Sequence, residues 1–442
     1  MKGGWQFDIK SWPLVLSVRT ISLLPLLNIS LRASTLLGKF LLIFFLARFL
    51  APGDLGLYGL FAATVGYALF AVGLDFYTYS TRELLKHERA VWGSYLKGHA
   101  VLCLLLYAML FPVVIALFSA GWMPWSLLPW LLGLLVLEHL NQELGRILIA
   151  VGQPMNASII LFFRSGLWAV AITVLMFVNP QFRNLEGVFQ AWALGASVGL
   201  CIGIWRLFCL DIGQWRNAID WTWVRRGVTV AVPFVIATLA LRGLSTLDRY
   251  WFQALVDLET LGAYVLFGGI SSALLSFLDA GVFAFIYPAL IKSYQMQDRA
   301  AFISGMRKLF FQTVVLSLGF VLCALIVINP LLTWLGKPLY ITQLYLFPWI
   351  LAAAVLYALG MIPHYALYAQ SQDKSIIRSH IISLAIFILT TAALAPWFGG
   401  LAVPVGLCIA FLFILCWKTW AFYRLTPAPF RSFRPADSQA VI

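Results

Sequence analysis

Five basic residues stand inside long apolar runs of this 442-residue sequence. A charged side chain near the middle of a bilayer costs on the order of 3 kcal/mol even on insertion scales, so these residues should face protein or a wet cavity rather than lipid. A cavity whose unpaired charges are basic suits an anionic ligand better than a cationic one. We therefore predict a substrate-binding surface that comprises Arg32, Lys39, Arg164, Arg242 and Arg249.

Two of these runs carry their basic residues at the same helical spacing. Arg32 and Lys39 lie seven residues apart, as do Arg242 and Arg249, which places each pair on one face of a helix. Two such stripes would converge on a cleft if their helices faced one another. The alternative is structural, with Asp248 paired to a neighbouring cation or Arg249 reaching the outer headgroups.

Acidic and histidine side chains form a second set. His139 and Glu143 are four residues apart, and Glu143 and Arg146 are three apart, so pairs can form within one helix. Such groups either relay the proton or cation that drives transport or join helices near the cytoplasmic face, and the sequence slightly favours the second interpretation. The residues that we assign to ion coupling or gating are Asp75, Glu138, Glu143, Asp248, Asp279 and His364.

The elements that carry these residues must be transmembrane helices. Hydrophobic residues make up 62% of the chain and charged residues 11%, whereas soluble domains are about half apolar and a quarter charged. A helix of roughly twenty apolar residues crosses a bilayer, and we predict an all-α polytopic membrane protein with about twelve spans. The predicted spans are 26–50, 55–79, 98–119, 127–150, 157–178, 187–210, 227–252, 260–289, 308–329, 343–369, 378–396 and 401–421.

The formal charge of +13 is explained by topology, so nucleic acid is not needed as a partner. Alternate loops are rich in Lys and Arg, and the loops between them hold only Arg48, Arg183 and Lys337. The positive-inside rule then places both termini in the cytoplasm. The residues on the basic side are Lys2, Lys10, Arg19, Arg82, Lys86, Arg89, Lys97, Arg146, Arg206, Arg216, Arg225, Arg226, Lys292, Arg299, Arg307, Lys308, Lys374, Arg378, Lys418, Arg424, Arg431 and Arg434.

Cofactor and enzyme motifs are missing from the sequence. The six cysteines lie in apolar runs without metal-ligand spacing, which predicts small buried hydrophobic side chains rather than a disulfide framework or a metal site. No phosphate-binding GxxxxGK[ST] loop, nucleophile elbow or dinucleotide fingerprint occurs. We expect a secondary transporter without a cofactor, rather than an enzyme.

The two halves of the chain resemble one another. Leu-Gly-Leu-Tyr at 55–58 recurs as Leu-Gly-Ala-Tyr at 261–264, and Leu-Asp at 74–75 recurs at 278–279. Six spans per half is an even number, so the halves should be parallel repeats with a cavity between them. The predicted parts are an interfacial segment (1–25), an N-terminal six-helix bundle (26–210), a cytoplasmic linker (211–226), a C-terminal six-helix bundle (227–421) and a cytoplasmic tail (422–442).

One junction resembles a known family. Leu-Ala-Arg-Phe-Leu-Ala-Pro-Gly-Asp-Leu-Gly-Leu-Tyr at 46–58, with Gly-Leu-Asp at 73–75 and Thr-Arg-Glu at 81–83, is similar to the first two helices of polysaccharide transporters. These are the Wzx-type flippases of the multidrug/oligosaccharidyl-lipid/polysaccharide exporter superfamily.

The resemblance implies a function and a place in the cell. An undecaprenyl-diphosphate-linked oligosaccharide would pass from the cytoplasmic to the periplasmic leaflet of the inner membrane by ion-coupled alternating access, through a cation-lined cavity. The cargo would serve surface polysaccharides such as O-antigen, lipopolysaccharide or exopolysaccharide. The partners implied are that lipid-linked glycan, the bilayer, and polymerase and chain-length proteins. A diphosphate carries about two negative charges and matches the planar fork of arginine.

Two other functions remain open at this stage. A cation-coupled multidrug exporter would keep the fold and change the cargo. A membrane polysaccharide polymerase or ligase would need a sizeable periplasmic loop, and the sequence has only short connections between its apolar runs, so we discount it.

Overall fold

The computed structural model describes residues 23–431, and these residues form helices without any strand. Apolar runs form helices in a membrane because the helix satisfies every internal backbone hydrogen bond within itself. The predicted segment 1–25 lies mainly outside the described residues. The helices are α2 (Leu23–Phe49), α3 (Pro52–Gly73), α4 (Tyr77–Leu84), α5 (Trp92–Ser119), α6 (Leu128–Ala150), α7 (Pro154–Leu161), α8 (Trp168–Val178), α9 (Leu185–Phe208), α10 (Trp221–Leu255), α11 (Leu258–Leu278), α12 (Ala284–Gln295), α13 (Arg299–Leu335), α14 (Pro338–Thr342), α15 (Phe347–Ala369), α16 (Asp373–Phe398), α17 (Ala402–Leu425) and α18 (Ala428–Arg431).

Most of these helices are long and apolar enough to cross a membrane. Within residues 23–431 there are 10 such stretches, one of which, Asp373–Leu425, contains both α16 and α17. Helix α6 is not among them because its second half carries polar side chains such as Glu138 and Glu143. Counting α6 and separating α16 from α17 gives twelve passes, so the predicted all-α, roughly twelve-span architecture is confirmed. The seventh pass starts earlier than predicted, because α10 begins at Trp221, inside the expected linker.

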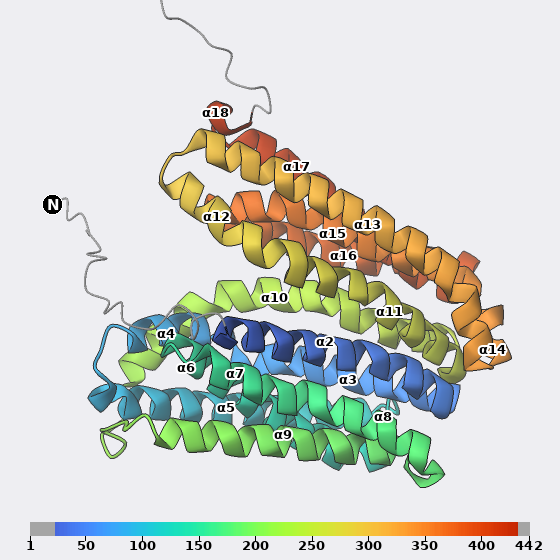
Figure 1. The fold of residues 1–442 in the computed structure, drawn as a ribbon, viewed down its shortest axis with the longest axis horizontal. Coiled ribbons are helices and arrows are strands. Elements are labelled where there is room, and N and C mark those ends of the chain that lie inside the picture. The colour runs from blue at the N-terminus through green and yellow to red at the C-terminus, as the bar shows by residue number, and fades with distance from the viewer. Residues whose placement is uncertain (1–22, 432–442) are drawn as a thin grey trace, which may run out of the picture.

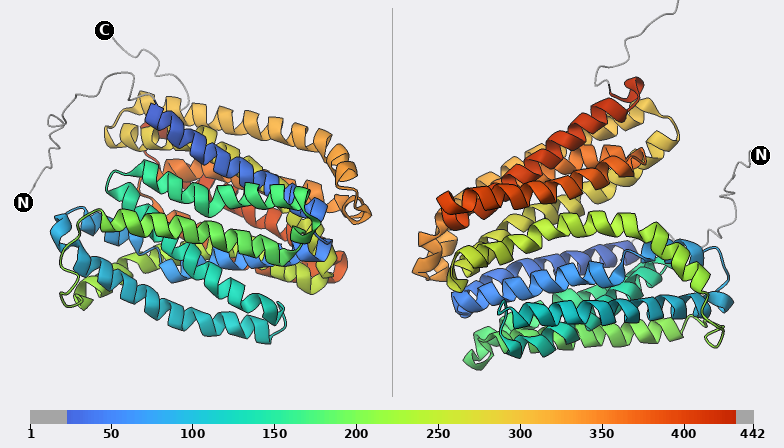
Figure 2. Two further views of the ribbon diagram at one scale, coloured as in Figure 1. Left: turned by 60° about the horizontal axis from the view of Figure 1, so that its bottom comes forward. Right: turned by 180° about the vertical axis from the view of Figure 1, so that it is seen from behind.

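The passes form two lobes with the same internal pairing. In the N-terminal lobe (α2–α9), α2 packs on α7 and α8, α3 on α6, and α6 on α9. In the C-terminal lobe (α10–α18), the equivalent helices pair likewise: α10 with α16, α11 with α15, and α15 with α17. Figure 1 shows the lobes as two layers, blue to green below and yellow to red above, and Figure 2 shows both from two other sides.

The largest contacts between the lobes involve four helices. Helix α3 packs along α11, and this central pair is flanked by α2 against α11 and by α10 against α3. Toward the end that carries α4 and α18, the yellow and red helices diverge from the blue and green ones (Figure 1). Only α10 continues there alongside the N-terminal lobe, since it also packs on α4 and α5. The basic loops predict that this is the cytoplasmic end.

The outer surface of the helices is apolar, as contact with lipid requires. Val178, Phe208 and Trp397 are exposed by 77%, 81% and 82%. The prediction of buried cysteines is wrong for four of the six, because Cys201, Cys209, Cys323 and Cys416 lie on this surface. In a bilayer a small hydrophobic side chain loses nothing by facing lipid, so apolar runs do not by themselves indicate burial.

Candidate functional site

The repeated Leu-Asp dipeptide marks a break in the second helix of each lobe. At Leu74 and Asp75 the backbone turns left-handed, with φ of 49° and 48°, and ends α3 before α4 begins. At Asp279 the helix continues instead through a π-helical segment, Asp279–Phe283, between α11 and α12. Left-handed non-glycine residues and π-bulges are both energetically costly and frequent at functional sites. The sequence repeat therefore coincides with a local irregularity in both lobes.

Helix α10 carries two polar side chains, one turn apart, between these two aspartates. Thr238 Oγ1 donates to Asp75 Oδ2 at 2.8 Å, which ties α10 to the N-terminal lobe. Arg242, one turn further along, lies within electrostatic range of Asp279 in the C-terminal lobe and over the ring of Phe70 at 4.9 Å. The Arg242 side chain is exposed. Of the predicted residues, the structure thus places Asp75 and Asp279 near α10, the helix that carries Arg242.

The basic stripe on α2 faces a second π-helical segment. Arg32 Nε donates to Ser158 Oγ of α7 at 3.0 Å, and the side chains of Arg32 and Lys39 are both exposed. Next to α2, the fifth pass (Pro154–Val178, which comprises α7 and α8) becomes π-helical over Phe162–Leu167, where Gly166 packs directly on the backbone of Thr35. This contact fixes the stripe relative to α7 and α8.

Arg164 and Glu138, which the sequence assigns to different roles, form an ion pair. Arg164 Nε lies 2.5 Å from Glu138 Oε2. The other carboxylate oxygen of Glu138 accepts from Trp192 Nε1 at 2.7 Å. Lys39 lies within electrostatic range of both Glu138 and Arg164. The carboxylate is thus satisfied inside the N-terminal lobe and holds α6, the fifth pass and α9 together.

Arg249 and Asp248 lie where the lobes touch. Arg249 Nη1 donates to the Gly59 carbonyl of α3 at 2.6 Å, across the lobe boundary. Asp248 is buried and accepts from the Tyr264 hydroxyl of α11 at 2.8 Å. The two neighbouring residues on α10 therefore contact different lobes, and Asp248 makes no salt bridge to a cation within the described residues.

The charged group expected within α6 extends to the neighbouring helix α5. Glu143 Oε1 lies 2.5 Å from Arg146 Nη1 and 4.0 Å from His139 Nε2, as the spacing predicts. Its other oxygen lies 3.8 Å from His99 Nε2 of α5. His139 Nδ1 pairs with the Tyr107 hydroxyl at 2.8 Å. These contacts join α5 and α6, and sequence reasoning overlooked His99.

His364 does not lie near the predicted acidic groups but beside two bases. Lys418 of α17 lies between His364 of α15 and His380 of α16, and it is only 2% exposed. The prediction that Lys418 belongs to the basic residues of the connecting segments is wrong, because it is buried within α17. His380 was overlooked. A lysine inside a long apolar run, with a histidine on each of the two preceding passes, was the available signal.

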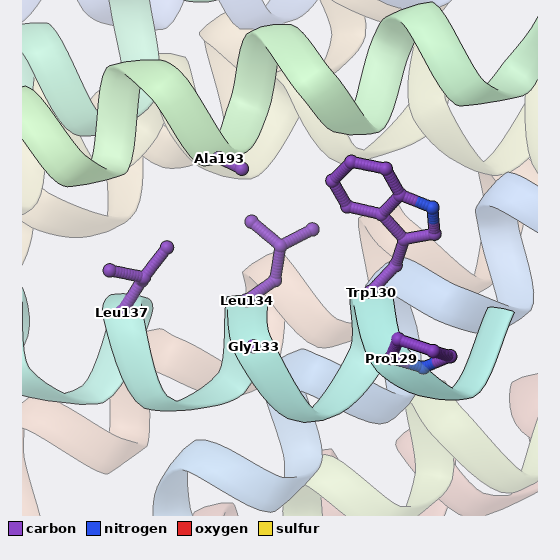
Figure 3. A pocket seen from close by; sticks show the side chains of 6 residues that line it. All are labelled: Pro129, Trp130, Gly133, Leu134, Leu137 and Ala193. Carbon is purple, nitrogen blue, oxygen red and sulfur yellow. The ribbon is translucent and has the colours of Figure 1, made fainter.

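Two apolar pockets in the N-terminal lobe contain none of these charged side chains in their lining. One, of about 270 Å³, is an apolar groove between α6 and α9. The other, of about 350 Å³, lies beside α8 and α9 and is also apolar. Neither includes a candidate binding residue, so neither is the predicted substrate site. Figure 3 shows the lining of the first, which consists of Pro129, Trp130, Gly133, Leu134, Leu137 and Ala193.

Several solved structures of membrane transporters share this fold. A multidrug resistance MATE family transporter of the MOP superfamily, in an inward-facing conformation, matches with a TM-score of 0.74 at 13% identity, covering 90% of this chain and 98% of that one. An outward-facing MATE family transporter matches with a TM-score of 0.58 at 15% identity, covering 90% and 95%. A mutant MATE transporter from Vibrio cholerae matches with a TM-score of 0.57 at 13% identity, covering 94% and 100%.

These likenesses establish the fold of the chain. It is a multi-pass membrane protein with the two-lobed architecture of MATE transporters. No protein-family model and no curated protein sequence matches it. The neighbours are membrane transporters, and in the described residues no group of His, Cys, Asp and Glu is arranged to hold a metal ion.

Proposed function

We propose that the protein flips undecaprenyl-diphosphate-linked oligosaccharides from the cytoplasmic to the periplasmic leaflet of the inner membrane. One observation carries this proposal: three basic side chains of α2 and α10 form no direct ion pair within the described residues, although Glu138 and Asp279 lie within electrostatic range of Lys39 and Arg242. Arg32, Lys39 and Arg242 take part in none of the salt bridges found among residues 23–431. Basic side chains within a membrane protein that have no direct ion-pair partner indicate an ion or substrate pathway.

A diphosphate headgroup has the negative charge that these basic side chains can neutralise. Two guanidinium groups and one ammonium group can together neutralise about two negative charges, and arginine binds phosphate oxygens through two parallel hydrogen bonds. Arg32 and Lys39 belong to the N-terminal lobe, whereas Arg242 belongs to a helix that contacts both lobes. A headgroup held between them would bind both lobes and follow their rearrangement. The polyprenyl tail would stay in the lipid beside the apolar helix surfaces.

The proposal extends to the pathway around the protein. Flipped repeat units serve surface polysaccharides, so the polymerase and chain-length proteins of that pathway are the proposed partners. Because a flippase of this kind hydrolyses no nucleotide and the chain lacks a GxxxxGK[ST] loop, an ion gradient would drive it.

Complementation of a flippase-deficient strain tests the proposal. Arg32→Ala and Arg242→Ala combined should abolish surface polysaccharide, because they remove a headgroup contact from each side. Arg82→Ala, at an exposed position in the last turn of α4, should leave it unchanged. Binding of undecaprenyl diphosphate to the protein in nanodiscs should weaken in parallel. Full activity of the double variant, or equal affinity for undecaprenol and its diphosphate, would contradict the proposal.

Multidrug export is the second candidate function, and the MATE likeness supports it. A cationic drug would need an acidic site, and Asp75 and Asp279 are two carboxylates near α10, the helix that contacts both lobes. Expression of the protein in a drug-sensitive strain separates the candidates. Raised resistance that depends on Asp279 but not on Arg32 would favour the exporter.

A further inference from the structure

Three basic side chains meet inside the C-terminal lobe, and we call them the basic triad. Lys418 Nζ lies 3.2 Å from His364 Nδ1 and 3.1 Å from His380 Nε2. Lys418 and His380 are 2% and 5% exposed. Each residue comes from a different helix, α17, α15 and α16, so the contact depends on the tertiary structure.

The triad has no acidic partner. Among residues 23–431 no carboxylate makes a salt bridge with any of the three. The other titratable side chains around it are tyrosines, Tyr365 and Tyr368 of α15, whose rings contact His364. Helix α10, which packs on α16, presents the backbone of Ala237 to His380. A buried charge without a counter-ion is expensive, so the triad is not a structural ion pair.

The geometry limits how many protons the triad holds. Each short nitrogen–nitrogen contact needs one N–H donor and one lone pair as acceptor. A charged Lys418 satisfies both contacts only while His364 and His380 are neutral. A second excess proton would remove an acceptor and place two positive charges about 3 Å apart in a low dielectric. The triad therefore holds at most one excess proton.

The triad is mechanically connected to the other lobe. His380 lies against Ala237, and the next residue, Thr238, donates to Asp75 at the break after α3. Helix α10 is also the element of the C-terminal lobe that continues beside α4 and α5 at the diverging end. A charge gained in the triad therefore acts electrostatically on α10, the helix that contacts both lobes.

We infer that the Lys418–His364–His380 triad is the proton-binding site that couples a proton gradient to the rearrangement of the lobes. The step is simple: a proton adds to one nitrogen lone pair, forms one N–H bond, and leaves by the reverse reaction, with nothing oxidised or reduced. The inference rests on the proposed transport function for its purpose but not for its chemistry.

Histidine NMR tests proton binding without any cargo. The chain has five histidines, so the signals of the full-length protein in nanodiscs, labelled with nitrogen-15 at histidine, can be assigned by single substitutions. His364 and His380 should shift together in one single-proton step between pH 5 and 9. Lys418→Met should split or remove this step, whereas Lys374→Met, an exposed lysine of the same lobe, should leave it unchanged. Invariant signals across this range would identify a purely structural contact and overturn the inference.

A distance measurement tests the coupling. Spin labels at Glu88 and Gln295, exposed residues in the cytoplasmic regions of the two lobes, should report a pH-dependent distance in a cysteine-free background. The pH dependence of this distance should be lost in Lys418→Met and in His380→Gln. Two variants are used so that the test remains valid if one of them fails to fold. A normal pH dependence in both variants would overturn the coupling. If the unmodified protein fails to complement a flippase-deficient strain but shows both the histidine titration and the pH-dependent distance, the proposed cargo is wrong and the proton-binding site is retained.

Discussion

Arg48 and Lys337 each bind the end of the other's helix. Arg48, in the last turn of α2, donates to the carbonyl of Trp334 near the end of α13, and Lys337, just after α13, donates to the carbonyl of Leu50 after α2. The C-terminus of each helix is thus bound by a basic side chain from the other lobe, and each positive charge lies where the helix dipole is negative. We call these four residues the outer latch.

Breaking the outer latch should open the outer side. Arg48→Gln with Lys337→Gln removes two charge-assisted hydrogen bonds, each worth about 1.5–3 kcal/mol, so states with separated outer ends gain population. Spin labels at the exposed residues Ser126 and Tyr345 should report a longer distance between the lobes.

The third outer cation provides the matched control for this experiment. Arg183 donates to the carbonyl of Met176 and stacks on Phe49, both within the N-terminal lobe. Arg183→Gln should therefore leave the distance between the lobes unchanged. An unchanged distance in the double latch variant would show that the latch does not hold the outer ends together.

The number and order of the passes could be predicted because a run of roughly twenty mostly apolar residues is long enough to cross a bilayer. Helix α6 meets this condition only in part, since its second half is polar. The contacts that the charged side chains make could not be predicted from the sequence. Arg164 and Glu138 lie 26 residues apart on helices that meet only in the folded lobe. Lys418 was misplaced because a lysine near a helix end ordinarily extends to the headgroups, whereas here α15 and α16 enclose it. The π-helical segments could not be predicted, although one of them begins at Asp279, in the second copy of the repeated Leu-Asp dipeptide.

The cap of α11 predicts how stability depends on pH. Asp257 lies between α10 and α11 and accepts from the Thr260 backbone N–H at 2.6 Å, which lowers the pKa of its carboxyl below the ordinary value. A lowered pKa means that the stabilisation is present above the unfolded pKa of about 3.9 and is lost as the pH falls through the folded value. Asp257→Ala should cost about 1 kcal/mol at pH 7. Thermal unfolding should show this loss shrinking below about pH 4. Glu259→Gln, an exposed position in the first turn of α11, removes only a helix-dipole contact worth about 0.3–1 kcal/mol and should cost less than loss of the cap. An equal loss from both variants would contradict the capping role.

The ion pair of Glu138 and Arg164 separates structural from substrate-binding roles. Glu138→Ala leaves a partly buried guanidinium unpaired and should cost about 3–5 kcal/mol of stability, whereas Glu138→Leu with Arg164→Met should be nearly neutral. Thermal unfolding in detergent measures both, with the exposed Glu186→Gln as control. If the double variant is stable and still complements a flippase-deficient strain, Arg164 is not needed for substrate binding. Loss of transport with retained stability would assign it to the substrate surface with Lys39.

The glycines of the repeated Leu-Gly-x-Tyr motif bring the lobes into direct backbone contact. A Cβ on Gly56 would lie 2.5 Å from the Leu258 carbonyl oxygen, and a Cβ on Gly262 would lie 2.0 Å from the Pro52 carbonyl oxygen. Pro52 and Leu258 each precede the glycine of their own repeat by four residues, so the contact is reciprocal. Close approach of two helices in a membrane depends on such small residues.

Alanine at these glycines should therefore separate α3 from α11. Because the neighbouring atoms are backbone, neither helix can move a side chain aside, and we expect Gly56→Ala or Gly262→Ala to disfavour the closed outer interface by about 1–3 kcal/mol. The distance between labels at Ser126 and Tyr345 should lengthen, as it does when the latch is broken. Gly66→Ala and Gly268→Ala, on the same two helices with open space at the Cβ position, are the matched controls. Both should behave as the unmodified protein does. If Gly262→Ala leaves the interface closed, the contact between α3 and α11 tolerates a methyl group, and the repeat does not specify the interface between the lobes.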